Sequence, residues 1–219
     1  MQRTKVVIFD LDDTLYKEID FLKSAYREIA SYLQNKYAIG DAYEFMIQKY
    51  AEGKNVFEET NTNYSIAVPF DEYLNIYRNH IPEISLEKAT SETLLYLQNQ
   101  GCVMGLITDG RTNTQQNKIE ALGLSRYLNK DLIIISEDFG SSKPDIKNYS
   151  YFQATERAAK YFYIADNPLK DFISPNLLGW ETICLLDNGM NIHRQDFSLP
   201  KEYLPKYRVA SLTEIIKII

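Results

Sequence analysis

The sequence predicts an α/β protein, in which helices cover a parallel sheet and a further helical segment is inserted near the start. Five short runs rich in β-branched residues are almost continuously apolar, as strands buried on both faces must be. Segments of helical length separate the last four runs, an alternation typical of a parallel sheet. The first two runs are about 90 residues apart, far more than one crossover helix needs. The expected strands are residues 6–9, 103–107, 132–135, 161–165 and 182–186.

The long gap after the first run is expected to hold a helical cap. Apolar residues recur at three- and four-residue spacing in 19–33 and again in 70–77, which predicts two amphipathic helices. Pro82 and Ser85 mark the exit from the insertion. We therefore place the cap at residues 16–83 and the core at residues 1–15 and 84–219.

The remaining core elements follow from helix-ending signals. Residues 86–100 supply the missing crossover helix, closed by Gly101, and residues 112–122 form the next helix, closed by Gly123. Residues 209–212 are expected to form a last short strand, and Thr213 is expected to cap a C-terminal helix.

Composition and charge narrow the classes of function. Of 219 residues, 45% are hydrophobic and 25% are charged, as in ordinary soluble proteins. The net charge of -6 disfavours binding to a nucleic-acid backbone, and no stretch approaches the roughly 18 apolar residues of a membrane span. Cys102 and Cys184 lie in apolar segments, which indicates buried thiols in a reducing compartment. Only four apolar residues stand between Lys5 and Asp10, too few for the apolar region of a signal peptide, so we expect a cytoplasmic protein.

Polar clusters follow the strands at the sheet edge where ligands bind in parallel α/β proteins. Taken singly, each cluster also has a structural interpretation, because aspartates cap helices and Thr-Asp-Gly forms turns. Asn167 followed by Pro168 fits a helix start, with Asp171 in its first turn. The four clusters are Asp10 to Thr14, Thr108 to Gly110, Gly140 to Pro144 and Asp166 to Asp171.

The acidic residues of these clusters suit a hard cation. Asp10 and Asp12 are two residues apart, so in an extended chain both carboxylates point to the same side. Close carboxylates repel each other unless they share a cation or a proton. Mg²⁺ binds one or two carboxylates together with waters and substrate phosphate, so Asp10 facing Asp166 would suit it. Zinc is disfavoured, because cysteine is sparse and neither His80 nor His193 lies near a cluster.

Together and in this order, the four clusters resemble the haloacid dehalogenase superfamily. The run Asp10-Leu11-Asp12-Asp13-Thr14 follows an apolar strand and matches that family's Asp-x-Asp-x-Thr motif. Gln115 and Lys118 are similar to a pattern of members whose cap follows the first strand. The resemblance covers nearly the whole chain and implies a Rossmann-like, doubly wound parallel sheet with an inserted α-helical cap. It also implies phosphoryl transfer through an aspartate, with Mg²⁺ as cofactor.

The resemblance implies a role for each matching residue. Asp10 would be the nucleophile and Asp12 the general acid and base. Thr108 would contact phosphate, and Lys143 would steady phosphate and nucleophile. The metal ligands would be Asp10, Asp12 and Asp166, and Asp171 would be an outer acidic residue that acts directly or through water. Thr14, Asp109 and Arg111 are secondary candidates, and Arg111 is expected to face the site because it directly follows the second cluster.

Two residues depart from the family pattern. Asp109 stands where Asn is usual, and Ala165 stands where Gly is usual. Asp109 would bring a further negative charge near a phosphate, so it is expected to turn away, hydrogen-bond locally or alter the choice of substrate. Neither change removes a catalytic group.

The leading hypothesis is a Mg²⁺-dependent phosphatase of a small phosphorylated metabolite, a sugar phosphate or a nucleotide monophosphate. It would act through an aspartyl-phosphate. Asp12 favours a phosphatase over a dehalogenase, because a halide leaves without protonation. The alternatives are a phosphotransferase or mutase of the same superfamily, or a silent phosphate- and metal-binding regulator. A phospho-receiver domain is disfavoured by the order of the clusters and the length of the insertion, and oligomeric state is left open.

The cap would recognise the rest of the substrate. Nine of the 17 tyrosines lie between Tyr16 and Tyr77, and most of these are expected to pack helix against helix rather than to line a wall for a base or sugar. The candidates for contact with an anionic substrate arm are Lys17, Lys54, Arg78 and His80, although each taken singly is expected to be a solvated surface residue.

Overall fold

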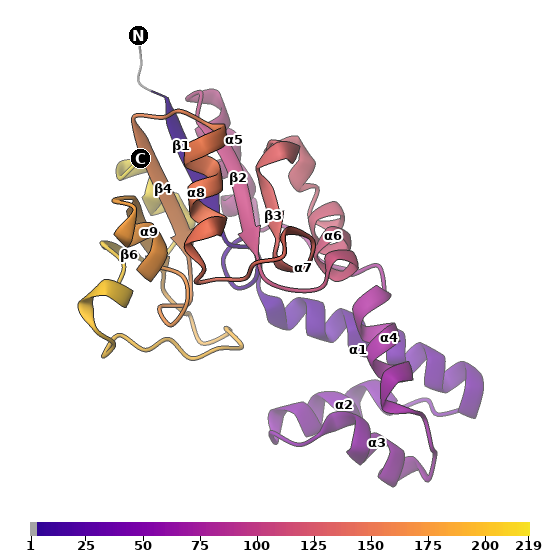
Figure 1. The fold of residues 1–219 in the computed structure, drawn as a ribbon. Coiled ribbons are helices and arrows are strands. Elements are labelled where there is room, and N and C mark those ends of the chain that lie inside the picture. Colours follow the sequence, from indigo (N-terminus) through magenta and orange to yellow (C-terminus); the bar gives the residue numbers. More distant parts are fainter. Residues whose placement is uncertain (1–3) are drawn as a thin grey trace.

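A computed structural model describes residues 4–219 and shows a six-stranded parallel sheet with helices on both faces (Figure 1). The strand order is β3-β2-β1-β4-β5-β6, so β1 lies inside the sheet and the chain winds outward from it in both directions. The predicted doubly wound parallel sheet is confirmed. The strands are β1 (Lys5–Phe9), β2 (Val103–Thr108), β3 (Ile133–Ile135), β4 (Lys160–Ala165), β5 (Glu181–Leu185) and β6 (Tyr207–Val209).

Five predicted strands form with ends within one residue of the expected positions, but the last prediction is wrong. β6 ends at Val209, where the predicted strand was to begin. Tyr207 and Arg208 are exposed, so no apolar run marks this edge strand. The cap of the last helical turn is Ser211 instead of Thr213, because Ser211 and Glu214 form a reciprocal capping box.

Apolar side chains alternate between the two faces of β1 and so build one core on each side of the sheet. Val7 belongs to a buried cluster with Leu94 of α5 (Lys88–Asn99). Ile8 belongs to a second cluster with Tyr149 and Phe152 of α8 (Ile146–Thr155). The other core helices are α6 (Thr112–Ala121), α7 (Ser136–Phe139) and α9 (Ile173–Leu177), with 3₁₀ turns at Leu124–Arg126, Lys130–Leu132, Lys201–Tyr203 and Leu212–Lys217.

Four helices occupy the long gap between β1 and α5 and lie beyond one end of the sheet (Figure 1). They share a buried apolar cluster, in which Tyr73 stacks on Phe57 with ring centroids 4.7 Å apart and Tyr26 packs edge-on against Tyr50. These tyrosines therefore pack helix against helix, as predicted for most of them. The helices are α1 (Glu18–Tyr37), α2 (Ala42–Ala51), α3 (Val56–Tyr64) and α4 (Phe70–Asn79).

Both amphipathic segments predicted for the insertion lie in helices, the first within α1 and the second within α4. We call residues 18–79 the helical insertion; its separation from the core as a cap domain with the boundaries 16–83 stays a prediction. Within residues 4–219, no helix has both the length and the apolar character that crossing a membrane requires.

Candidate active site

Asp10 begins the candidate site, directly after the buried strand β1. Its backbone N–H donates to Ile164 O of β4 at 2.8 Å, which extends the sheet pairing by one residue and fixes the carboxylate at the strand end. The chain then leaves the sheet in a tight turn, because Leu15 N–H donates to Leu11 O at 3.0 Å and Asp13 adopts a left-handed φ of 57°. Aspartate tolerates this conformation better than most residues.

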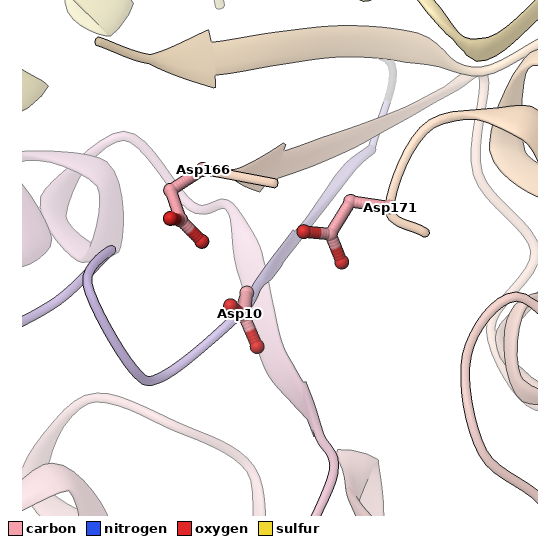
Figure 2. A group of neighbouring side chains, drawn as sticks. All are labelled: Asp10, Asp166 and Asp171. Atoms are coloured by element: carbon pink, nitrogen blue, oxygen red, sulfur yellow. The ribbon is translucent and has the colours of Figure 1, made fainter. Parts of the chain in front are cut away.

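Three buried carboxylates, those of Asp10, Asp166 and Asp171, point toward one another (Figure 2). Each contributes an oxygen, and these oxygens lie within 4.8 Å of one another. Burial raises the pKa of Asp10 to about 6. Burial, followed by repulsion from Asp10 and Asp171, raises the pKa of Asp166 to about 9. An all-oxygen set whose charges repel one another fits a hard divalent cation such as Mg²⁺.

Lys143 supplies a positive charge within this cluster. Its Nζ donates to Asp10 Oδ1 at 2.7 Å, lies 2.8 Å from Asp171 Oδ1 and donates to Tyr163 Oη at 3.4 Å. Burial by itself would lower the pKa of Lys143, but Asp10 and Asp171 together raise it well above its ordinary value. The ammonium therefore stays charged and holds the Asp10 carboxylate in one position.

Asp12 lines the same cavity as Asp10, as predicted, but its carboxylate has different partners. Lys118 Nζ donates to Asp12 Oδ1 at 2.7 Å, Tyr16 Oη donates to the same oxygen, and Gln115 Nε2 donates to Oδ2 at 3.0 Å. Burial would raise the pKa of Asp12, but Lys118, Tyr16 and Gln115 lower it below its ordinary value.

The carboxylate cluster differs from the predicted metal set in one member. Among residues 4–219, Asp171 joins Asp10 and Asp166, whereas the Asp12 side chain is directed to α6. The Asp12 side chain points differently from Asp10 because Asp12 lies beyond the end of the strand, where the two-residue pleat no longer sets direction. We therefore do not count the Asp12 side chain among those that would hold an ion.

Thr108 ends β2 beside this site, and Gln115 of α6 connects it to Asp12. Gln115 Nε2 donates to Thr108 Oγ1 as well as to Asp12 Oδ2. Gly110 makes room for this contact, because a Cβ at this position would lie 3.1 Å from the Gln115 side chain. Gly110 also has a φ of 149°, which side chains rarely allow. Gln115 and Lys118, which match a pattern of the family in the sequence, thus hold the loop that follows β1.

Asp109 hydrogen-bonds locally, which was one of the three outcomes expected. Its Oδ1 accepts the backbone N–H of Lys143 at 3.0 Å, and its Oδ2 accepts Lys170 Nζ at 3.2 Å. Burial and the charge of Lys143 by themselves would lower the pKa of Lys170. The carboxylates of Asp10, Asp171 and Asp109 outweigh them, so the pKa of Lys170 is raised above its ordinary value. The extra carboxylate is therefore matched by an ammonium.

Thr14 and Arg111 lie outside this cavity. Thr14 is buried behind the loop, and its Oγ1 has no hydrogen-bond partner among the described residues. Arg111 was expected to face the site but does not. Its side chain is 63% exposed and pairs with Glu137 of α7. The structural interpretation of Asn167 as a helix start does not describe what forms: residues 168–170 make a turn, α9 begins at Ile173, and Asp171 Oδ2 accepts the Asn167 N–H at 3.0 Å.

The segment after β5 reaches the site through Asn191. Asn191 Nδ2 donates to Asp166 Oδ2 at 2.9 Å, and its Oδ1 accepts Lys17 Nζ at 2.6 Å. Asp13 adds a second tie, because its carboxylate accepts the N–H groups of Ile192 at 2.9 Å and Glu18 at 3.0 Å. The loop after β1, the start of α1 and the segment after β5 are thereby joined.

The helical insertion contacts the core at α6. Thr114 Oγ1 donates to Arg78 O at 2.9 Å, and Asn117 Nδ2 donates to His80 O at 3.0 Å. The His80 ring is buried against Phe21 and hydrogen-bonds to Ser24, so it packs in the insertion and does not contact the cavity. Helix α6 therefore touches both the insertion and the loop that carries Asp12.

A cavity of about 150 Å³ lies over these groups. Five residues that line it were given no functional role from the sequence: Asp13, Glu18, Asn167, Lys170 and His193. Lys170 and Asn167 stood inside the fourth cluster, and Asp13 stood inside the first. Glu18 and His193 had no motif around them. The lining residues assigned from the sequence are Asp10, Asp12, Thr108, Asp109 and Asp166.

Comparison with known proteins identifies the class. Residues 7–184 match the family model for haloacid dehalogenase-like hydrolases. The chain is 28% identical to a glyceraldehyde 3-phosphate phosphatase of Methanocaldococcus jannaschii, over 98% of this chain and 96% of that one. It is 28% identical to the pyrimidine 5'-nucleotidase YjjG of Escherichia coli, over 64% of this chain and 60% of that one.

The fold agrees with solved structures of this kind. The HAD-hydrolase YfnB from Bacillus subtilis, solved with bound magnesium, has a TM-score of 0.68 at 20% identity and is covered over 99% of both chains. The chain belongs to the haloacid dehalogenase-like hydrolases, because the family model spans most of its length. The resemblance inferred from the four clusters is confirmed.

Proposed function

We propose that the protein is a Mg²⁺-dependent phosphatase that hydrolyses a small phosphorylated metabolite through a phosphorylated Asp10. The observation that carries this proposal is the 2.7 Å contact between Lys143 Nζ and Asp10 Oδ1 inside the cluster of three carboxylates. A carboxylate that attacks a phosphate dianion meets like-charge repulsion. An ammonium and a divalent cation oppose that repulsion, and this site provides the first and fits the second.

The proposed reaction has two steps that use Asp10 and Asp12. In the first step, an Asp10 oxygen attacks phosphorus, the bond from phosphorus to the ester oxygen breaks, and Asp12 gives that oxygen a proton. In the second step, Asp12 takes a proton from a water whose oxygen attacks phosphorus, which releases Asp10 and inorganic phosphate. The lowered pKa of Asp12 suits the second step. The negative charge of a bound phosphoryl group favours the protonated form that the first step needs.

The groups that would hold Mg²⁺ are Asp10, Asp166 and Asp171. Bound there, the ion would act as a Lewis acid toward the phosphoryl oxygens. Lys143 bridges Asp10 and Asp171, so the protein keeps these two carboxylates in register for the ion. Thr108 ends the adjoining strand and lines the cavity, where it would contact the phosphoryl group.

The size of the cavity favours a small substrate. Its volume of about 150 Å³ lies below the range that begins at roughly 300 Å³ for drug-sized ligands. Among the substrate classes inferred from the sequence, a sugar phosphate of few carbons fits such a volume better than a nucleotide. The similarity to a glyceraldehyde 3-phosphate phosphatase over nearly the whole chain supports the same choice.

The test is phosphate release from p-nitrophenyl phosphate, glyceraldehyde 3-phosphate and nucleotide monophosphates, with Mg²⁺ or with EDTA. We expect turnover only with Mg²⁺, a preference for the triose phosphate, and no turnover by Asp10→Asn. Asp20→Asn is the matched control, because Asp20 is an exposed aspartate at the start of α1. Activity that survives Asp10→Asn or EDTA would contradict the mechanism.

We place this activity in the cytoplasm, with a small molecule and not a nucleic acid as its partner. The support is that both cysteines, Cys102 and Cys184, are free thiols and that the net charge is -6.

A further inference from the structure

We propose that Lys170 binds the phosphoryl group of the substrate and that Asp109 holds Lys170 in place for this. The inference rests on the proposed function and adds to it a residue that the four-cluster resemblance did not assign.

Lys143 is not placed to meet the substrate by itself. Its side chain is 0% exposed, its Nζ is shared between Asp10 and Asp171, and it does not line the cavity. Lys170 does line the cavity, and its side chain is 35% exposed. Of the two lysines close to Asp10, Lys170 is therefore the one whose ammonium a ligand can reach.

The cavity needs such a cation. Six of its lining residues carry carboxyl groups, and Lys170 is the only lysine or arginine among the described residues that line it. A phosphate dianion entering a space walled by carboxylates is repelled unless positive charge lies close to its oxygens. A divalent cation in the three-carboxylate cluster would supply part of that charge at one side. Lys170 supplies further positive charge from the side of the cavity where Asp109 lies.

Asp109 fixes the position of this ammonium. Asp109 Oδ1 accepts the backbone N–H of Lys143, so the Asp109 carboxylate cannot swing freely, and Oδ2 accepts Lys170 Nζ at 3.2 Å. An ammonium has three donors, and the contact with Asp109 uses one of them. The others remain for phosphoryl oxygens. The family pattern has Asn at position 109. The site can hold the extra negative charge of Asp109 because Asp109 is paired with Lys170, the lysine that it positions.

The test is calorimetric binding of inorganic phosphate to the full chain in the presence of Mg²⁺. Charge-assisted contacts to phosphate are strong, so we expect Lys170→Met to weaken binding at least about tenfold, which corresponds to about 1.4 kcal/mol. Lys170→Arg keeps the charge and is expected to recover most of the affinity. Lys147→Met is the matched control, because Lys147 is exposed on α8, away from the cavity, and this change should leave binding as in the wild type.

Three results would overturn the inference. Phosphate binding by Lys170→Met that equals the wild type would show that the ammonium makes no contact. Equal losses for Lys170→Met and Lys170→Arg would indicate a packing role instead of a charge. If the wild type does not bind phosphate, the cavity has no phosphate site for Lys170 to serve.

Assays of phosphate release on the same proteins separate this inference from the proposed function. If the wild type turns over, Asp10→Asn does not, and Lys170→Met binds phosphate normally, only the role of Lys170 falls. If phosphate binding depends on Lys170 but no substrate is hydrolysed, Lys170 stands and the phosphatase proposal fails. Where both hold, Lys170→Met should raise KM by a larger factor than it lowers kcat, because the contact exists in the bound substrate.

Discussion

Lys118 Nζ lies 2.7 Å from Asp12 Oδ1, although the two residues are 106 positions apart in the chain. The parallel pairing of β1 with β2 brings them together, since it places the start of α6 beside the loop that follows β1. Both side chains are mostly buried, at 4% and 19% exposed. The carboxylate proposed as proton donor is thus held by a helix that also contacts the helical insertion.

Lys118→Met should destabilise the protein at neutral pH. Breaking a buried ion pair from one side typically costs about 3–5 kcal/mol, and methionine keeps most of the aliphatic stem. The pKa of Asp12 is lowered in the folded protein, so the pair stabilises above the ordinary carboxyl pKa, and that stability is lost as pH falls through the folded pKa. Denaturant unfolding should therefore show a large deficit at pH 7 that shrinks in acid.

The control for this change is Lys88→Met. Lys88 and Glu92 form an ion pair on α5 with both side chains largely exposed, and such pairs contribute little. Equal unfolding midpoints for Lys118→Met and the wild type at pH 7 would show that the Asp12 contact carries no stability.

Removal of divalent metal should make stability depend on pH through Asp166. Its pKa is raised to about 9, so between the ordinary carboxyl pKa and about 9 the folded state retains a proton that the unfolded chain has lost. Stability of the metal-free protein should then fall as pH rises across this window. Bound Mg²⁺ would replace the proton and remove most of the slope. Unfolding midpoints at several pH values, in EDTA and in Mg²⁺, check this, and parallel curves would contradict it.

Asn191→Ala should weaken Mg²⁺ binding. Asn191 donates to Asp166 Oδ2, and partners that orient metal ligands typically affect affinity by about 10–100-fold. We expect a loss near the lower end of that range, because Asp166 is also fixed by its place after β4. Calorimetric titration of Mg²⁺ measures it. Asn188→Ala changes an exposed residue of the same segment and should bind Mg²⁺ as the wild type does.

Gly105→Ala should destabilise the sheet. A Cβ at Gly105, in the middle of β2, would clash with Leu132 O and lie 2.9 Å from Ile8 Cδ1. Overpacking of this kind typically costs about 1–3 kcal/mol. Gly40→Ala is the control, because a Cβ there meets only the flexible end of Gln34 at 3.2 Å. Thermal unfolding should separate the two variants clearly, and similar melting temperatures would be inconsistent with this packing.

The sheet could be predicted from the sequence because its strands carry a local signal. A strand buried on both faces is a run of apolar residues, and five such runs matched within one residue. β6 has no such run, since Tyr207 and Arg208 face solvent at the edge. Its formation depends on pairing with β5, which is a property of the folded sheet.

The candidate site could be predicted only in part, because its polar contacts depend on where distant segments meet. Asp10, Thr108 and Asp166 were found from their places after strands, a local signal. The pairing of Asp12 with Lys118 depends on the orientation of α6, and the contact of Asn191 depends on the path of the segment after β5. Arg111 was placed wrongly, because nothing near it in the sequence indicates that Glu137 binds it.

The position of β1 inside the sheet also fixes the order in which the protein can assemble during synthesis. β1 is flanked by β2 and β4, so one edge of this apolar strand stays unpaired until residue 165 has been made. Asp166, Asp171 and Asn191 emerge later still. The apolar cluster of the helical insertion is formed mostly by residues 18–79, with Ile192 packed against it, and local contacts form early. We therefore expect the insertion to begin folding during synthesis, before Asp10 meets Asp166 and Asp171.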